Sequence, residues 1–335
     1  MALESDFMKD ICFSRELQEN YNLQNKHLFK KKTGNAKWYY QLIFDETLDN
    51  DLNELHKLYN QNIPFKIFGM HTNMYITDNG YDGLFVDISP KNSTISFNKE
   101  TELFTVSSNV AVSKLVNYAM ELGYDFAALT GIPGLVGSGV VGNSSFTASG
   151  KGFSDFVYGI KLYDFNDGKT IDVVPNNDFF GDRDSFMKQQ NRNQTRFFVK
   201  EIILKGDYIG KEAVKEKYDA QMERRKVSLK FGFLEGSAGS LWSPVHLKKQ
   251  IGKSFSKLLR ENPSINANFN GATYSPNGAM FFTTGEKTTD KDVAKLFVHT
   301  LEEVKKLYNV DLHKEVFILD YDGEIDLETF ISRNT

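Results

Sequence analysis

The sequence predicts an α+β protein built in two sections, and three patterns indicate this fold class. Short β-type runs separated by Asn-Gly and Asp-Gly turns fill residues 63–88. Two other stretches, residues 52–62 and 288–309, place apolar side chains at helical spacing. The composition then changes near residues 207–212, where a charged, helix-prone segment follows strand-like runs. We therefore expect the boundary between the two sections at that point.

The first section is expected to alternate strands and helices. Leu52, Leu55 and Leu58 form the apolar stripe of the first helix. Alternating residues then predict a hairpin, and Gly123 is expected to end a second helix. The remaining expected elements of this section are the hairpin at 93–108, the second helix at 112–123 and strands within 156–174 and 195–206.

The second section is expected to begin with a charged helix at 209–232 and to close on a strand at 315–323. Between them, the helix at 288–309 should start with a capping box formed by Thr289 and Asp292. Its apolar stripe comprises Val293, Leu296, Phe297, Leu301, Val304 and Leu307.

The composition of the amino-terminal residues differs from that of both sections. Residues 1–40 are polar and charged, and we expect a helical or loose extension. Within it the basic run "KHLFKKK" at 26–32 is interpreted as a solvated face or flexible arm, in preference to a binding patch.

Composition excludes several function classes. The 335 residues carry a net charge of −4, without the basic surplus typical of nucleic-acid-binding proteins. Cys12 is the only cysteine, so the chain forms no internal disulfide and no cysteine metal site. The first residues lack a secretory signal pattern, and no run is long enough to span a bilayer. We expect a soluble cytoplasmic protein.

The segment "GIPGLVGSG" at 131–139 holds four glycines in nine residues. Glycine lets backbone N–H groups turn toward an anion and lets a ligand approach closely. The segment therefore fits either a phosphate cradle or a tight turn between core elements. It is not a Walker loop, because no Gly-Lys-Ser/Thr follows it.

Four separated motifs occur in a fixed order: "FGMHTN" at 68–73, the glycine-rich segment, "FFGDRDSF" at 179–186 and "GSAGSLWSP" at 236–244. With the long helix and the "HKEV" that follow, this order resembles the UDP-N-acetylenolpyruvoylglucosamine reductases, often called MurB. The resemblance covers roughly residues 64–320.

The resemblance implies a fold and a division into domains. The fold would be the PCMH or vanillyl-alcohol-oxidase type of FAD-binding fold, with two subdomains, followed by a MurB-like α+β substrate domain. The implied limits are an extension at 1–40, an FAD domain at 41–208 with subdomains near 41–90 and 91–208, a substrate domain at 209–320 and a tail at 321–335 packing back on the FAD domain.

The resemblance also implies cofactors and site residues. FAD would be bound, with NADPH as reductant and a nucleotide-sugar-like small molecule as substrate; no nucleic acid or membrane partner is expected. Ser240 matches the family's proton donor, and Arg183 and Glu315 match the pair that stabilises the enol-like intermediate. The implied cofactor-binding residues are Gly69, Met70, His71, Thr72, Asn73, Gly131, Ile132, Pro133, Gly134, Gly137, Ser138 and Asn143.

The sequence departs from the family most in its substrate half. Asp182 replaces a tyrosine before Arg183, and an acid there would partly neutralise the guanidinium. After Ser240 the sequence reads Leu-Trp-Ser-Pro, without the family's Lys and Asn. These departures keep two alternatives open, a flavin oxidase of a sugar or alcohol and a non-catalytic flavin-binding homologue.

His71 occupies a position where the family has glycine, in the segment "GMHT". Some flavin oxidases of the wider superfamily carry a histidine there that is covalently bonded to the flavin. His71 therefore offers either a covalent FAD link or a hydrogen bond to the pyrophosphate. The other histidines lack metal-ligand spacing, so no metal is predicted.

Overall fold

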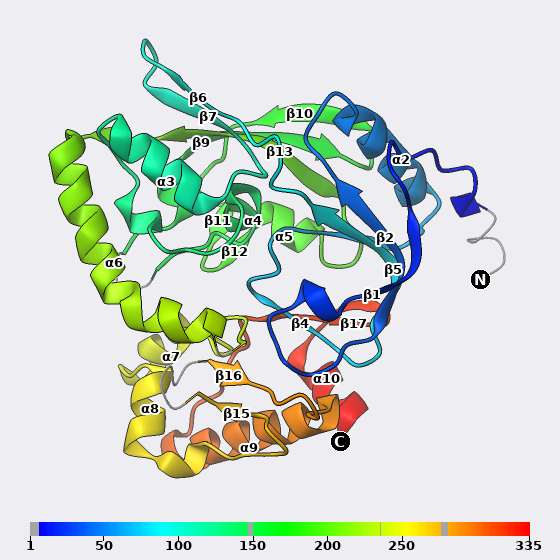
Figure 1. Ribbon diagram of the computed structural model, residues 1–335. Coiled ribbons are helices and arrows are strands. Elements are labelled where there is room, and N and C mark those ends of the chain that lie inside the picture. The colour runs from blue at the N-terminus through cyan, green and yellow to red at the C-terminus, as the bar shows by residue number, and fades with distance from the viewer. Residues whose placement is uncertain (1–6, 147–149, 235, 276–280) are drawn as a thin grey trace. The chain divides into compact units, whose positions relative to one another are not determined.

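The computed structural model describes residues 7–146, 150–234, 236–275 and 281–335 (Figure 1). The chain forms two compact units. Unit 1 contains Met1–Tyr21, Lys37–Met70 and Asp82–Arg224; unit 2 contains Asn22–Ala36, His71–Tyr81 and Arg225–Thr335. Strands and helices are mixed throughout, which confirms the α+β class. The domain limits implied at 40, 208 and 320 stay a prediction.

Unit 1 is built on two sheets. The first has the strand order β1-β2-β5-β3 and the second the order β10-β9-β13-β7-β6. Figure 1 shows α3 and α4 against one face of the second sheet. The strands of these two sheets are β1 (Gln18–Asn22), β2 (Asn35–Leu42), β3 (Phe65–Phe68), β5 (Tyr81–Ile88), β6 (Ile95–Asn98), β7 (Leu103–Ser107), β9 (Val157–Asp164), β10 (Lys169–Val173) and β13 (Phe197–Lys205). Two short strand pairs, β8 (Tyr124–Asp125) with β14 (Asp207–Tyr208) and β11 (Phe180–Gly181) with β12 (Asp184–Ser185), also belong to the unit. Its α-helices include α2 (Leu48–Asn60), α3 (Val112–Glu121), α4 (Val136–Val141) and α5 (Phe186–Gln190).

Several local predictions for unit 1 are confirmed. Leu52, Leu55 and Leu58 are fully buried on α2, as their spacing indicates. β6 and β7 pair antiparallel as the predicted hairpin. Gly123 follows α3 with a positive φ of 84°, a conformation that glycine adopts at little cost.

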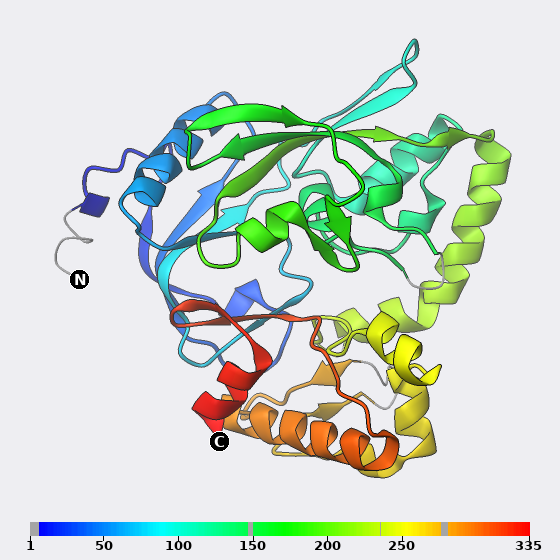
Figure 2. The same ribbon diagram turned by 180° about the vertical axis from the view of Figure 1, so that it is seen from behind.

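Unit 2 combines a small mixed sheet with helices. β4 (Met74–Ile76) runs parallel to β17 (Phe317–Asp320), which pairs antiparallel with β18 (Gly323–Ile325). This sheet therefore joins residues far apart in the sequence. Figure 2 shows α9 and α10 of this unit from behind. The helices are α6 (Lys211–Leu234), which begins in unit 1, α7 (Pro244–Ile251), α8 (Phe255–Glu261), α9 (Asp290–Tyr308) and α10 (Leu327–Asn334).

The amino-terminal expectation is wrong. Instead of a helical or loose extension, residues 18–22 and 35–42 are the strands β1 and β2. The flexible-arm interpretation of the basic run is also wrong, because His27, Phe29 and Lys31 are buried. Only one side of this irregular segment, with Lys30 and Lys32, is solvated.

The capping box at the start of α9 is confirmed, because the Thr289 side chain accepts from the Asp292 N–H and the Asp292 carboxylate accepts from the Thr289 N–H. Among the helices that the structure describes, none combines the length and the apolar character needed to cross a bilayer.

Candidate functional site

The glycine-rich segment of unit 1 is a turn that leads into α4. Gly131 and Gly134 have φ angles of 72° and 110°, a region that side-chain-bearing residues rarely adopt. Gly137 and Gly139 are required for close packing. A Cβ on Gly137 would lie 2.5 Å from Ser108 Cβ, and a Cβ on Gly139 would lie 2.3 Å from the Phe153 ring. The later glycines therefore permit close packing, while the first two shape the turn.

Two buried hydroxyls beside this turn suit a polar ligand. Within the described residues, Ser108 Oγ and Thr130 Oγ1 have no hydrogen-bond partner. Thr130 directly precedes Gly131, and Ser108 packs against Gly137. A buried hydroxyl without a partner is uncommon and calls for an explanation. A phosphate-bearing cofactor held by the turn would supply acceptors, so this segment fits the dinucleotide that the motif implies.

The start of the "FGMHTN" loop packs on the same segment. A Cβ on Gly69 would lie 3.2 Å from Ser138 Oγ and 3.4 Å from a Leu135 methyl. Met70 follows and is 47% exposed. Within unit 1 the structure therefore brings Gly69 together with Ser138, two residues that the motifs assign to the cofactor.

Arg183 lies at the tip of a tight hairpin in unit 1. The hairpin pairs β11 (Phe180–Gly181) with β12 (Asp184–Ser185), which leaves Asp182 and Arg183 in the turn. Arg183 has a φ of 55°, and its Nη1 donates to Ser145 O at 2.6 Å. Its carbonyl accepts from Lys188 Nζ at 2.8 Å. The guanidinium is thus held by the backbone of the loop that follows α4.

Asn143 supports this hairpin. Its Nδ2 donates to Gly181 O at 2.8 Å, and its Oδ1 accepts from the Ser154 N–H at 3.0 Å. Asn143 adopts a φ of 40°, which asparagine tolerates better than most residues. The predicted cofactor ligand therefore also joins the glycine-rich segment to the hairpin that carries Arg183.

In unit 2 the segments carrying Ser240 and Glu315 lie side by side. The Glu315 N–H donates to Leu241 O at 2.7 Å, and the Ser243 N–H donates to His313 O at 2.8 Å. Ser240 itself pairs with Phe281 on its other side. Both Ser240 and Glu315 are half-buried, which leaves their side chains partly accessible.

The remainder of the "FGMHTN" loop joins this pair in unit 2. Asn73 Nδ2 donates to Glu315 O at 3.2 Å, and Asn73 O accepts from the Phe317 N–H at 3.1 Å. His71 and Thr72 precede it and are half-buried. His71 has a φ of 56°, which explains why a glycine suits this position in related proteins.

Trp242 explains one departure from the family pattern. Its ring is buried, and Nε1 donates to Tyr274 Oη at 2.8 Å. Tyr274 Oη also lies 3.1 Å from Thr300 Oγ1, and burial raises the pKa of the Tyr274 phenol. The position after Leu241 is therefore an anchor in the core of unit 2 and cannot serve as a polar ligand contact.

The predicted catalytic trio is divided between the units. Ser240 and Glu315 are brought together in unit 2, whereas Arg183 belongs to unit 1. Ile132 and Pro133 lie within the turn of the glycine-rich segment, between the two glycines with positive φ. No cluster of three or more His, Cys, Asp or Glu side chains suited to a metal is found in the described part of the chain.

Sequence reasoning missed a buried ionic cluster in unit 2. Lys31 Nζ donates to Asp78 Oδ1 at 2.7 Å and to Ile76 O at 3.2 Å, and it lies 3.1 Å from Asp290 Oδ1. His27 and Phe29 precede it on the same buried face. The sequence held no local signal for this cluster, because Asp78 and Asp290 lie far from Lys31 in the chain.

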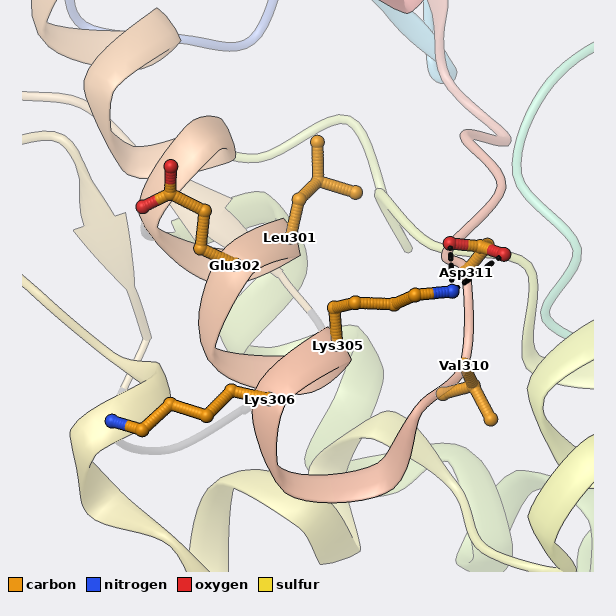
Figure 3. Close-up of a pocket in the computed structure, with 6 residues that line it drawn as sticks. All are labelled: Leu301, Glu302, Lys305, Lys306, Val310 and Asp311. Carbon is orange, nitrogen blue, oxygen red and sulfur yellow. Dashed lines mark hydrogen bonds and ion pairs between the residues drawn. The ribbon is translucent and has the colours of Figure 1, made fainter.

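A surface hollow of unit 2 lies away from these residues. It is lined by Leu301, Glu302, Lys305, Lys306, Val310 and Asp311, at the carboxyl end of α9 (Figure 3). The Lys305 ammonium pairs with Asp311 at 3.0 Å across it. None of the motif residues lines the hollow, so the motifs and not the hollow define the candidate site.

Comparison with known proteins agrees with the motifs. Residues 47–173 match the family described as "FAD binding domain". The chain is 30% identical over 276 residues to the UDP-N-acetylenolpyruvoylglucosamine reductase of Thermotoga petrophila, covering 81% of this chain and 90% of that protein. It is also 30% identical over 283 residues to the enzyme of the same name from Petrotoga mobilis, covering 82% of this chain and 86% of that protein.

A solved structure shares the fold. The UDP-N-acetylenolpyruvylglucosamine reductase (MurB) from Thermus caldophilus superposes with a TM-score of 0.68 at 19% sequence identity. The match covers 90% of this chain and 98% of that one. The FAD-binding fold expected from the motif order is therefore confirmed.

Proposed function

The chain belongs to the family of UDP-N-acetylenolpyruvoylglucosamine reductases, and we propose that it reduces an enolpyruvyl nucleotide sugar with electrons from NADPH. It is an FAD-dependent oxidoreductase. The observation that carries the proposal is the pairing of the Ser240 and Glu315 segments, with Asn73 bonded to Glu315. This pairing joins both proposed catalytic residues of unit 2 to the loop assigned to the cofactor.

The proposed FAD-binding residues fall into two groups. In unit 1 the turn from Gly131 to Gly134 would present backbone N–H groups to the pyrophosphate, assisted by the hydroxyls of Ser108 and Thr130. In unit 2 the loop from His71 to Asn73 would provide the second group. Bound FAD supplies hydride transfer, which no protein side chain can perform.

Three side chains are proposed to act on the substrate. The Ser240 hydroxyl would donate a proton to C2 of the enolpyruvyl group after hydride reaches C3. Arg183 and Glu315 would stabilise the enol-like intermediate, in which negative charge builds on the carboxylate side. The bond from Arg183 Nη1 to Ser145 O supports this role, because a guanidinium held by backbone needs little reorganisation during reaction.

The substrate is assigned by its chemical class. The segment after Ser240 lacks the Lys and Asn that the family carries there, and Trp242 of this segment is buried in the core, so the nucleotide would need other contacts. We therefore assign the class, an enolpyruvyl nucleotide sugar or a close relative, serving cell-envelope sugar synthesis such as that of peptidoglycan in the cytoplasm.

His71 is proposed to hold FAD without a covalent bond. Its positive φ puts it at a position that favours glycine, and a half-buried ring there can contact a ligand of the loop. A covalent link is the alternative, and it would favour an oxidase. Acid precipitation of the purified protein distinguishes them: yellow flavin in the supernatant supports the non-covalent form, and flavin in the pellet overturns it.

The decisive experiment separates flavin reduction from substrate turnover. Under anaerobic conditions NADPH should bleach the flavin, and UDP-N-acetylenolpyruvoylglucosamine should restore its colour. Ser240→Ala should keep the bleaching step but slow reoxidation by about 10²–10⁴-fold, because it lacks the proton donor. Ser243→Ala, three residues away, is the matched control and should reoxidise at the wild-type rate.

Each failure has a distinct meaning. Reoxidation by oxygen with sugars, but not by the enolpyruvyl substrate, would replace the reductase by the oxidase. Failure of every candidate substrate and of oxygen to reoxidise the flavin would favour a non-catalytic flavin-binding homologue. Unchanged reoxidation in Ser240→Ala would remove Ser240 from the mechanism while leaving the substrate assignment in place.

A further inference from the structure

The buried face of the amino-terminal basic run follows the "FGMHTN" loop and β4 within unit 2. Lys31 bonds Ile76 O and Asp78, and the Phe29 ring lies 5.3 Å from the Tyr75 ring. The two segments therefore run in the same direction, with Phe29 beside Tyr75 and Lys31 beside Ile76 and Asp78. This order puts His27 near the loop that begins at His71, and the charge of His71 acts on the His27 ring.

The His27 ring is buried, and it makes no well-formed hydrogen bond to the part of the chain that the structure describes. The residue is 7% exposed, and neither Nδ1 nor Nε2 has a partner among the described residues. Two other histidines show the usual arrangement: His56 Nδ1 lies 2.6 Å from Phe165 O, and His299 Nε2 lies 2.7 Å from Ser264 O. Because buried polar atoms are nearly always bonded, the exception points to a group that is bound during function.

Burial keeps this imidazole neutral. Together with the charges of Lys31 and His71, burial lowers the pKa of His27 to about 4. The backbone of Lys31 and the carboxylate of Asp78 act in the opposite direction. A neutral imidazole presents one N–H donor and one acceptor, so it can bond a polar ligand without burying a charge.

We propose that His27 is a further cofactor-binding residue, whose ring N–H donates to a phosphate oxygen of the dinucleotide held by the loop that begins at His71. The inference rests on the proposed function, because it takes the ligand of that loop to be FAD. The basic run at 26–32 would then take part in FAD binding through a neutral imidazole and not through its positive charges. Lys31 takes no direct part, since its ammonium is already satisfied by two carboxylates and two carbonyls.

The test compares His27→Leu with the wild type in two measurements on the full chain produced in riboflavin-depleted cells. The first is the melting temperature without flavin, and the second is the Kd for added FAD by fluorescence quenching. If His27 awaits a ligand, leucine removes unsatisfied polar atoms, so the flavin-free protein should melt at the same or a higher temperature. The Kd should rise about tenfold, the value of one lost hydrogen bond.

Two further variants sharpen the result. His27→Gln keeps an N–H donor and should recover part of the lost affinity. His299→Leu is the matched control from the same unit, because it removes a ring that is already bonded to Ser264 O. It should lower the melting temperature and leave the Kd for FAD unchanged, which is the reverse of the pattern expected for His27→Leu.

Three outcomes would overturn the proposal. An unchanged Kd in His27→Leu would show that the ring does not contact FAD. A flavin-free His27→Leu that melts lower or fails to fold would show that the ring is a structural element. If wild-type protein does not bind FAD while remaining folded, the proposed function itself fails, and the inference fails with it.

Discussion

Replacing Lys31 with methionine should destabilise the fold, although Lys31 lies in a run that looks solvated. Its side chain is 0% exposed, and Nζ lies 2.7 Å from Asp78 Oδ1 and 3.1 Å from Asp290 Oδ1. It also lies 5.0 Å from the centre of the Tyr75 ring. Methionine keeps most of the volume and removes the charge, so the change isolates the ionic contribution.

The size of the stability loss depends on the carboxylates that Lys31→Met leaves buried without their cation. Asp290 is 3% exposed, and among the described residues its carboxylate would keep the Tyr75 hydroxyl and the Asp78 N–H as donors without Lys31. Removing one member of a buried ion pair typically costs about 3–5 kcal/mol. The Asp78 side chain is 41% exposed and stays partly solvated without Lys31. Asp290 is therefore the one buried carboxylate of this pair that would lose its cationic partner. We therefore expect the low end, about 3 kcal/mol at pH 7.

The loss should depend on pH in a defined direction. Burial already raises the pKa of Asp290, and the charge of Lys31 acts against this rise. Without Lys31 the pKa rises further, so the folded variant binds a proton more readily than the unfolded chain does. Its folded state therefore gains stability as pH falls through that raised pKa, and the difference from wild type should shrink.

Urea unfolding at several pH values measures this difference. Lys30→Met is the matched control, because Lys30 is the exposed neighbour in the same run, and it should stay within about 0.5 kcal/mol of wild type. Equal stability of the two methionine variants at pH 7 would refute the buried ion pair. A loss in Lys31→Met that stays constant toward acid pH would refute the assignment of the cost to Asp290.

Three further predictions concern other parts of the chain. Because the pKa of His27 is lowered to about 4 from 6.5, folding should lose up to about 3 kcal/mol as pH falls from 6.5 to 4; His27→Leu should lack this contribution in acid unfolding curves. Asn143→Ala, which loses bonds to Gly181 and Ser154, should cost about 2 kcal/mol and speed hydrogen exchange in the Arg183 hairpin; unchanged exchange would contradict this coupling. Thr289→Ala should cost about 1 kcal/mol in thermal unfolding and Thr289→Ser much less, whereas equal losses would exclude the cap.

The elements that the sequence predicted well are those fixed by neighbours in the chain. The apolar stripe and the capping box of α9 both lie within one helix, so spacing and side-chain type suffice to place them. The β6–β7 hairpin likewise pairs residues close in the chain, from Asn98 with Leu103 to Ile95 with Val106. Local periodicity carries this information, and the resemblance then supplied the FAD-binding fold.

The arrangements that the sequence did not reveal depend on distant partners. The burial of Lys31 requires Asp78 and Asp290, which lie on two other segments of unit 2. The parallel pairing of β4 with β17 joins Met74 to Phe317. No local sequence pattern specifies such a distant partner. The sequence of a basic run that is buried therefore looks the same as the sequence of one that is solvated. In the site, the motifs predict Asn143 as a cofactor ligand, but they do not indicate that it supports the Arg183 hairpin.

Under the proposed function, the loop from His71 to Asn73 would serve both cofactor binding and catalysis. Asn73 bonds both the Glu315 carbonyl and the Phe317 N–H, and β4 continues the contact along β17. These hydrogen bonds couple the position of the loop to the position of the Glu315 backbone. The positive φ of His71 is tolerable for the same reason, because the paired strands hold the turn that follows it. A histidine that replaces glycine here costs backbone strain, and a ligand contact made by its ring is the compensation that the proposed FAD site supplies.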